Sequence, residues 1–243
     1  MFKPSFFWLL TSGFWLLVCS LSAANSAKSV KIVNYSNFQP SYCDYRFEHE
    51  AWRLGLYAFN SAPELTPFFA DLKKKYQIDT IVETGTFKGS STLVFAHLVD
   101  TVHTIDIKDT NYLFAKENLK PFSNVQCHLG SSEKVLSTLL PSLKNKRVLF
   151  YLDAHGQEHW PLLNELQEIA KTHKDNCIIV IDDFKVPGRE DIPFDYYGEL
   201  ECSDEYVKKD LDKVLTAYSA QYIIPKSKDS RAKFVAIPLQ WQK

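Results

Sequence analysis

The chain has 243 residues, of which 45% are apolar, and this length suits one domain with its own hydrophobic core and an N-terminal extension. Its 28 lysine and arginine residues nearly balance 29 acidic residues, so the formal charge is -1. No stretch concentrates basic side chains as a phosphate-binding surface does. We therefore expect no nucleic-acid partner.

The N-terminus carries an apolar run, residues 6–24, that contains no charged side chain. Lys3 is the one charged side chain before it. A basic start, an apolar middle and small residues up to Ala27 predict a secretory signal. If it is not cleaved, the same run is about long enough to anchor the protein in a bilayer, and residues 6–24 then make its membrane contact. A buried N-terminal helix is the remaining alternative. We expect residues 1–27 to direct export, periplasmic or secreted, or membrane anchoring.

Residues 28–66 are rich in aromatic side chains but show no regular hydrophobic period, which predicts an extension that packs over the main domain at 67–243. The extension contains Cys43, and the main domain contains Cys202 in a polar segment. No metal-type cysteine spacing is present. If the protein is exported, we expect Cys43 and Cys202 to be able to form a disulfide.

From residue 67 onward, strand-like and helix-like segments alternate. Short runs rich in β-branched residues predict buried parallel strands at 80–82, 102–105, 125–128, 148–152 and 178–181. Helical segments are expected at 67–76, 90–97, 111–118, 132–140, 160–172 and 204–218. Two final runs, 221–224 and 233–237, predict a hairpin. The pattern predicts a doubly wound α/β domain whose mostly parallel, seven-stranded sheet ends in a C-terminal antiparallel hairpin.

A glycine turn follows the first of these strands, in the segment Glu83-Thr84-Gly85-Thr86-Phe87-Lys88-Gly89-Ser90. Gly85 and Gly89 allow the backbone to turn tightly and to approach a ligand, and Ser90 is placed to cap the following helix. The GxxxG spacing differs from the GxGxxG of a pyrophosphate-binding loop, which disfavours a nicotinamide dehydrogenase. Glu83, an acid before the glycine, suits a cationic group instead of a phosphate.

The next two strands add polar groups to the same edge of the sheet. Asp106 ends the second strand, at the distance where an acid binds ribose hydroxyls in nucleotide-binding α/β folds. Gly130 and Ser131 follow the third strand, where an adenine ring would lie. Taken with Glu83 and Gly85, these residues predict one crevice for a nucleoside-containing, positively charged cofactor.

Over about Asn60 to Pro238, the chain resembles the class I S-adenosylmethionine-dependent methyltransferases. The resemblance is strongest to poorly characterised bacterial members and metal-assisted sugar O-methyltransferases, through three segments: Glu83-Thr84-Gly85-Thr86 with Gly89-Ser90, Tyr151-Leu152-Asp153-Ala154-His155, and Ile181-Asp182-Asp183-Phe184. It implies S-adenosylmethionine as cofactor, contacted by Glu83, Gly85 and Asp106. The chain departs from the family at Ser131, where an acid near the adenine is common, and in its export signal, since the cofactor is cytosolic.

A second group of polar residues follows the fourth and fifth strands: Asp153, His155, Asp182 and Asp183. Three acids that converge at neighbouring strand ends repel each other, and a hard cation such as Mg²⁺ would relieve the repulsion. We therefore expect Asp153, Asp182 and Asp183 to bind a metal that lowers the pKa of an acceptor hydroxyl. Either His155 or His159 would then accept the proton.

These residues predict methyl transfer to a hydroxyl of a sugar or another small polar acceptor. Two alternatives remain open, because a fold does not decide a function. One is a non-catalytic, exported binding module of the same fold. The other, disfavoured by the glycine spacing, is an NAD-dependent oxidoreductase.

Overall fold

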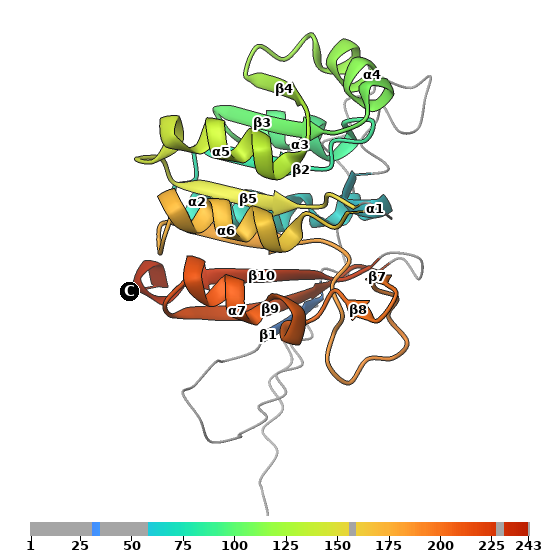
Figure 1. The fold of residues 1–243 in the computed structure, drawn as a ribbon, viewed down its shortest axis with the longest axis vertical. Helices are drawn as coiled ribbons and strands as arrows, with labels where there is room; N and C mark the ends of the chain where they lie inside the picture. The colour runs from blue at the N-terminus through green and yellow to red at the C-terminus, as the bar shows by residue number, and fades with distance from the viewer. Residues whose placement is uncertain (1–30, 35–57, 156–158, 227–230, 243) are drawn as a thin grey trace, which may run out of the picture.

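The computed structural model describes residues 31–34, 58–155, 159–226 and 231–242 (Figure 1). The predicted signal at 1–27 and Cys43 lie outside these ranges. Within them, no helix is long and apolar enough to cross a membrane. The export and anchoring predictions therefore stay predictions.

A single large sheet organises the molecule, with strand order β1-β9-β10-β6-β5-β2-β3-β4. Its strands are β1 (Lys31–Asn34), β2 (Thr80–Thr84), β3 (Thr101–Asp106), β4 (Val125–Leu129), β5 (Val148–Leu152), β6 (Cys177–Ile181), β9 (Tyr218–Ile224) and β10 (Lys233–Pro238). Only β10 runs antiparallel to its neighbours, β6 and β9. The predicted seven-stranded, doubly wound sheet with its closing hairpin is confirmed. The sequence did not predict β1, which adds an eighth strand parallel to β9.

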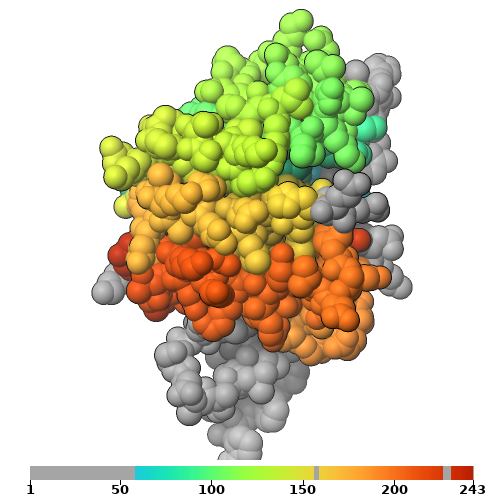
Figure 2. Space-filling model, viewed as in Figure 1, coloured from blue at the N-terminus to red at the C-terminus, as the bar shows by residue number. Residues whose placement is uncertain are grey.

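Helices cover both faces of the sheet, and Figure 1 shows α5, α6 and α7 in front of it. The elements are α1 (Ala58–Ser61), η2 (Pro63–Leu65), α2 (Thr66–Tyr76), α3 (Ser90–Leu98), α4 (Asp109–Leu119), α5 (Ser132–Leu143), α6 (Leu162–Thr172), α7 (Asp204–Val214) and η3 (Leu239–Gln242). Apolar side chains of α5–α7 form one core with the sheet, and those of α1–α3 form the other. In Figure 2 the residues of α5, α6 and α7 form adjoining bands across the front surface.

Strands β2, β5 and β6 are buried along their whole length. The apolar runs of β5 and β6 predict this burial, whereas β2 also buries Thr80, Glu83 and Thr84. β4 is different: it lies at the sheet edge and is only partly buried, so the prediction of a fully buried strand is wrong there. The predicted helix at 204–218 is too long. It ends at Val214, and Tyr218 already belongs to β9.

The long loop after β6 contains a small hairpin that the sequence did not reveal, formed by β7 (Tyr196–Tyr197) and β8 (Leu200–Glu201). Gly198, in the turn between them, has a φ of 62°, which a glycine adopts without steric cost. This hairpin brings Tyr197 and the preceding Asp195 to the edge of the sheet that carries the predicted site.

Residues 58–65, the described end of the predicted extension, pack onto the main domain. Phe59 is fully buried and its ring contacts those of Phe69, Phe95 and Tyr151. The Phe59 amide donates a 2.9 Å hydrogen bond to the hydroxyl of Ser91. The backbone of residues 59–61 has positive φ, and this turn directs the next side chain, Asn60, toward the site.

Candidate functional site

An open cavity of about 790 Å³ lies at the carboxyl ends of β2–β5, where the strand order reverses between β2 and β5. This is the position at which doubly wound sheets bind ligands. Of the residues predicted for the site, these line the cavity: Gly85, Asp106, Gly130, Ser131, Asp153, His155 and His159. The volume is in the range of small-molecule and cofactor sites.

The glycine turn after β2 packs directly onto the end of β5. A Cβ atom at Gly85 would lie 2.2 Å from the carbonyl oxygen of Asp153, so a side chain here would displace the β5 end. Gly85 also has a φ of 83°, in the region that favours glycine. The turn is held by the amides of Gly85 and Thr86, which both donate to the carbonyl of Ile105 at the end of β3.

The carboxylate of Asp106 fixes the backbone on the cavity side of this turn. It accepts a 2.7 Å hydrogen bond from the amide of Phe87 and a 2.8 Å bond from the amide of Lys108. The side-chain amide of Asn111 lies at 3.3 and 3.4 Å from the two carboxylate oxygens. These contacts occupy the lone pairs of both oxygens, so a ligand hydroxyl in the cavity would bind Asp106 by replacing the long contacts of Asn111.

Glu83 lies beneath the turn and does not line the cavity. It is 1% exposed, and one of its oxygens accepts from the hydroxyls of Thr92 and Thr104, the latter at 2.6 Å. Burial raises the pKa of Glu83 to about 8, although these hydrogen bonds act to lower it. Thr86 joins the network through a 2.6 Å hydroxyl contact with Thr104. In the structure these groups support the turn from below.

Gly89 and Ser90 also lie outside the cavity lining. The expected helix cap is misplaced by one residue: Gly89 is the N-cap of α3, and Ser90 is the first helical residue. The cofactor contacts predicted for Glu83, Thr86, Gly89 and Ser90 stay predictions.

The start of α5 forms a second wall of the cavity. Ser131 is the N-cap residue, and Ser132 and Glu133 follow it in the lining. Burial raises the pKa of Glu133, but hydrogen bonds from Ser131 and its own backbone, together with the charge of His159, outweigh burial and hold the pKa below its usual value. His159 Nε2 lies 3.4 Å from the Glu133 carboxylate.

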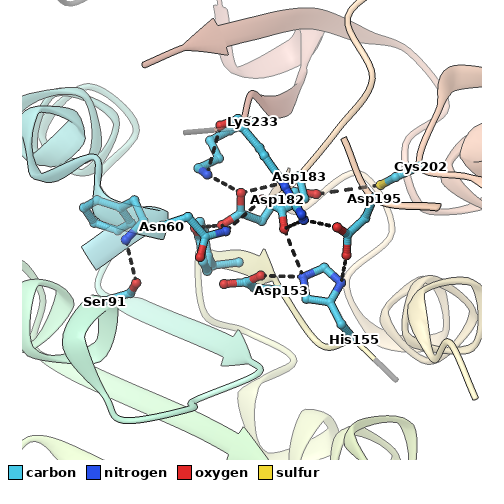
Figure 3. A network of polar contacts seen from close by, with 12 residues as sticks. Asn60, Ser91, Asp153, His155, Asp182, Asp183, Asp195, Cys202 and Lys233 are labelled. Carbon is cyan, nitrogen blue, oxygen red and sulfur yellow. Dashed lines mark hydrogen bonds and ion pairs between the residues drawn. The ribbon is translucent and has the colours of Figure 1, made fainter. Parts of the chain in front are cut away.

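Beyond β5 and β6, an acidic cluster surrounds His155, and Figure 3 shows the imidazole ring between Asp153 and Asp195. His155 Nε2 lies 2.7 Å from Asp153, and Nδ1 lies 2.9 Å from Asp195. Asp183 lies 3.6 Å from His155 Nε2 and 2.7 Å from Arg231. Arg231 also bonds Asp195. Two cations therefore lie among three carboxylates.

These charges shift the pKa values in the cluster. Burial lowers the pKa of His155, but the hydrogen bond and the charge of Asp153, with further acids nearby, outweigh burial and raise it to about 9. Burial raises the pKa of Asp183, but the charges of Lys233, His155 and Arg231 outweigh burial and bring the pKa below its ordinary value. At neutral pH, His155 thus holds a proton and Asp183 is ionised.

Asp182 turns away from this cluster into the core. It is fully buried, forms an ion pair with the equally buried Lys233 of β10 and accepts from the Tyr151 hydroxyl. Asn60 Nδ2 donates to Asp183 at 2.7 Å and lies 3.4 Å from Asp182. The main-chain carbonyl of Asp182 accepts from the buried thiol of Cys202, which has no disulfide partner among the described residues. Asp182 is therefore compensated by a lysine instead of facing its neighbours.

Ligand atoms of Asp153, His155 and Asp183 lie within 4.8 Å of one another and make up a possible divalent-cation group. His155 takes the place predicted for Asp182. The repulsion that motivated the metal prediction is already relieved by Arg231, Lys233 and the His155 proton. The donors are suitable, but His155 would have to lose its proton to bind a cation.

Sequence reasoning missed four residues of this cluster: Asn60, Asp195, Arg231 and Lys233. Each comes from a segment far along the chain from the residue that it contacts, in the α1 turn, beside β7 or around β10. The one available signal was the charged pair Arg231 and Lys233 at the start of an apolar strand, where a buried lysine needs an acidic partner.

Comparisons with known proteins give one family match and several similar folds. Residues 82–184 match the model of a family described as a methyltransferase domain. No curated protein matches the chain. The fold is similar to that of TomG, an O-methyltransferase of tomaymycin synthesis from Streptomyces achromogenes solved with SAM, with a TM-score of 0.54, 18% identity and coverage of 71% of this chain and 78% of that one.

Two further solved structures share the fold. An O-methyltransferase from Bacillus cereus in complex with SAH gives a TM-score of 0.53 at 16% identity, covering 74% of this chain and 83% of that one. A putative O-methyltransferase from Klebsiella pneumoniae gives 0.52 at 19% identity, with 71% and 79% covered. The family model and the shared fold together confirm the resemblance of this chain to the class I S-adenosylmethionine-dependent methyltransferases.

Proposed function

We propose that the protein transfers a methyl group from S-adenosylmethionine to a hydroxyl of a small polar acceptor such as a sugar. The observation that carries the proposal is the turn at Gly85, which packs against the Asp153 carbonyl at the head of a cavity of about 790 Å³ beside Asp106. Because Gly85 has no side chain, a ligand can approach the backbone of the turn directly. The arrangement also separates a nucleoside side of the cavity from the acidic cluster.

The residues of the nucleoside side suit S-adenosylmethionine. Asp106 lines the cavity and can accept from ribose hydroxyls that replace the long contacts of Asn111, and Gly130 leaves room for an adenine ring beside Ser131 and Glu133. When bound, the cofactor supplies a methyl group on a sulfonium centre. The chain has then to align the acceptor with that group and keep water away from it.

The acceptor side lies around Asp153, His155 and Tyr197, which line the same cavity. Trp160 contacts Tyr197 edge-on at 5.1 Å and stacks on Tyr206 at 4.5 Å between ring centroids, so an aromatic wall stands next to the acidic cluster. Carboxylates beside aromatic rings suit a polyhydroxylated ring, whose hydroxyls bond the acids and whose carbon face packs on the aromatic wall.

The metal-assisted form of the reaction would use Asp153, His155 and Asp183 as ligands and would lower the pKa of an acceptor hydroxyl. Without a cation, His155 already carries a proton and cannot accept another, which leaves His159 as the predicted base on the cavity wall. In the form without a cation, Asp153 orients the imidazole ring of His155.

Calorimetric titration of the full chain with S-adenosylmethionine, and separately with NAD, tests the proposal. We expect binding of the first alone, and Asp106→Ala should weaken it by roughly ten- to a hundredfold, the contribution of hydrogen bonds to a charged group. Asp109→Ala, an exposed acid on α4, is the matched control. Acceptor turnover in magnesium and in chelator separates the two forms of the reaction.

Unchanged affinity in a folded Asp106→Ala protein would refute the placement of the ribose. Binding of NAD would support an oxidoreductase. Tight binding of S-adenosylmethionine without turnover of any hydroxyl acceptor would support the non-catalytic binding module.

A further inference from the structure

Behind the nucleoside side of the cavity lies a buried group of polar atoms that the proposed reaction does not use. Glu165, in the first turn of α6, is 0% exposed. Among the described residues, neither of its carboxyl oxygens has a hydrogen-bond partner. The same holds for the hydroxyls of Thr84, at the end of β2, and Ser132, at the start of α5.

A buried polar atom without a partner is costly, and four of them in neighbouring elements require an explanation. Burial raises the pKa of Glu165 to about 7, while the hydroxyls of Ser132 and Thr84 act in the opposite direction. These two hydroxyls are therefore the polar surroundings of the carboxyl group. Both hydroxyls are close enough to lower this pKa as hydrogen-bond donors.

Ser132 connects this buried group to the ligand, because the residue also lines the cavity, although its hydroxyl oxygen is buried in the structure. A serine hydroxyl has one proton to donate. If Glu165 is ionised, it can only accept, and the Ser132 hydroxyl turns inward to donate to it. If Glu165 is protonated, it can donate to Ser132, whose own proton is then free to point into the cavity.

We propose that Glu165 is a positioning residue for the cofactor: its carboxyl group decides whether Ser132 donates a hydrogen bond into the cavity. The inference rests on the proposed function, since it assigns the adenine ring to the Ser132 wall. Glu133, next to Ser132, has a buried carboxylate oxygen without a partner among the described residues, which suits the amino group of adenine. A ring nitrogen beside that amino group needs a donor, and the Ser132 hydroxyl supplies it.

Several charged groups face Glu165. Glu133 of α5 raises its pKa, and His155 after β5 lowers it. His159 lies next to Glu133. On α7, which packs against α6, Asp210 accepts from Gln167, two residues beyond Glu165. Since His155 also titrates, the effect of Glu165 is defined by the difference between the pH profiles of the wild type and a variant.

The test measures the Kd of S-adenosylmethionine by calorimetry from about pH 5.5 to 8.5. We expect the wild type to bind roughly three- to tenfold more weakly at the alkaline end, the effect of one hydrogen bond, because ionised Glu165 withdraws the Ser132 proton. Glu165→Gln keeps the shape and a donor but cannot ionise, so it should bind tightly across the range. Glu168→Gln, on the same helix, is the matched control.

A double-mutant cycle separates this role from a structural one. In the Ser132→Ala background the donor is gone, so binding should be weak at every pH, and Glu165→Gln should then change nothing. Equal pH profiles for the wild type and Glu165→Gln, or a Glu165→Gln effect that persists without Ser132, would overturn the inference while leaving methyl transfer intact. Absence of cofactor binding in every protein at every pH would overturn both.

Discussion

A single proton on His155 links the acidic cluster to the stability of the fold. Burial lowers the pKa, but the hydrogen bond and charge of Asp153, with the charges of Asp183 and Asp182, outweigh burial, so the pKa rises from 6.5 in the unfolded chain to about 9 in the structure. A raised histidine pKa contributes stability that is complete below about pH 6.5. That stability is lost as pH rises through about 9.

We therefore expect the free energy of unfolding to fall by up to about 3 kcal/mol between pH 6.5 and 9, the equivalent of 2.5 pKa units. His155→Gln should lack this alkaline loss in urea denaturation at each pH. His97→Gln, an exposed histidine on α3, should behave as the wild type. A His155→Gln curve parallel to that of the wild type would show that the imidazole is not held as a cation.

Some contacts between residues of the acidic cluster could be predicted from the sequence. Asp153, His155 and Asp183 follow neighbouring parallel strands, and their proximity follows from the topology alone. Consecutive residues at a strand end point to opposite sides, but the sequence does not show which of Asp182 and Asp183 enters the core. Only the position of β10 shows that a buried lysine receives Asp182.

Among the secondary-structure elements, β10 has the largest influence on the site. It lies between β6 and β9 and brings Lys233 to Asp182, both fully buried. Removing one partner of a buried pair leaves an uncompensated charge. Lys233→Met should therefore lower the free energy of unfolding by about 3–5 kcal/mol in chemical denaturation.

Two variants complete this measurement. Adding Asp182→Asn to Lys233→Met should recover much of the loss, because the stranded charge is removed. Lys208→Met breaks an exposed pair on α7 and should cost less than about 1 kcal/mol. A small effect of Lys233→Met alone would mean that Asp182 is neutral in the native protein.

Most elements could be predicted because hydrophobic period and glycine turns are local signals. The failures have physical causes. β4 contains Gln126 and His128 and lies at the sheet edge, so its strand pattern does not bring full burial. The helical period of α7 continues into residues that pair as β9. The β7–β8 hairpin has two residues a strand, too few for a period to show.

For the whole molecule, the compartment determines the state of the cysteines and the supply of cofactor. We propose export, for which the signal-like residues 1–27 are the support, with a Cys43–Cys202 bridge in the mature chain. Cys202 is buried and Cys43 lies outside the described residues, so the bridge requires the extension to reach beneath the β7–β8 hairpin.

Mass spectrometry of the native protein, alkylated after denaturation without reductant, tests this proposal. We expect a chain that begins near residue 28, with Cys43 and Cys202 protected from alkylation. On the chain-entropy model, such a bridge stabilises the fold by roughly 4–5 kcal/mol. An intact Met1 with both thiols alkylated would refute export and would place the protein where S-adenosylmethionine is plentiful.

The place of β10 in the chain also determines when the site can form during synthesis. Lys233 and Arg231 neutralise Asp182 and Asp183, which directly follow β6, yet both basic residues leave the ribosome well after these acids. Until then the edge of β6 is unpaired and Asp182 and Asp183 have no basic partners from this strand. A nascent or truncated chain that lacks β10 therefore exposes an open, acidic strand edge, and such an edge is what chaperones and proteases recognise in incomplete proteins.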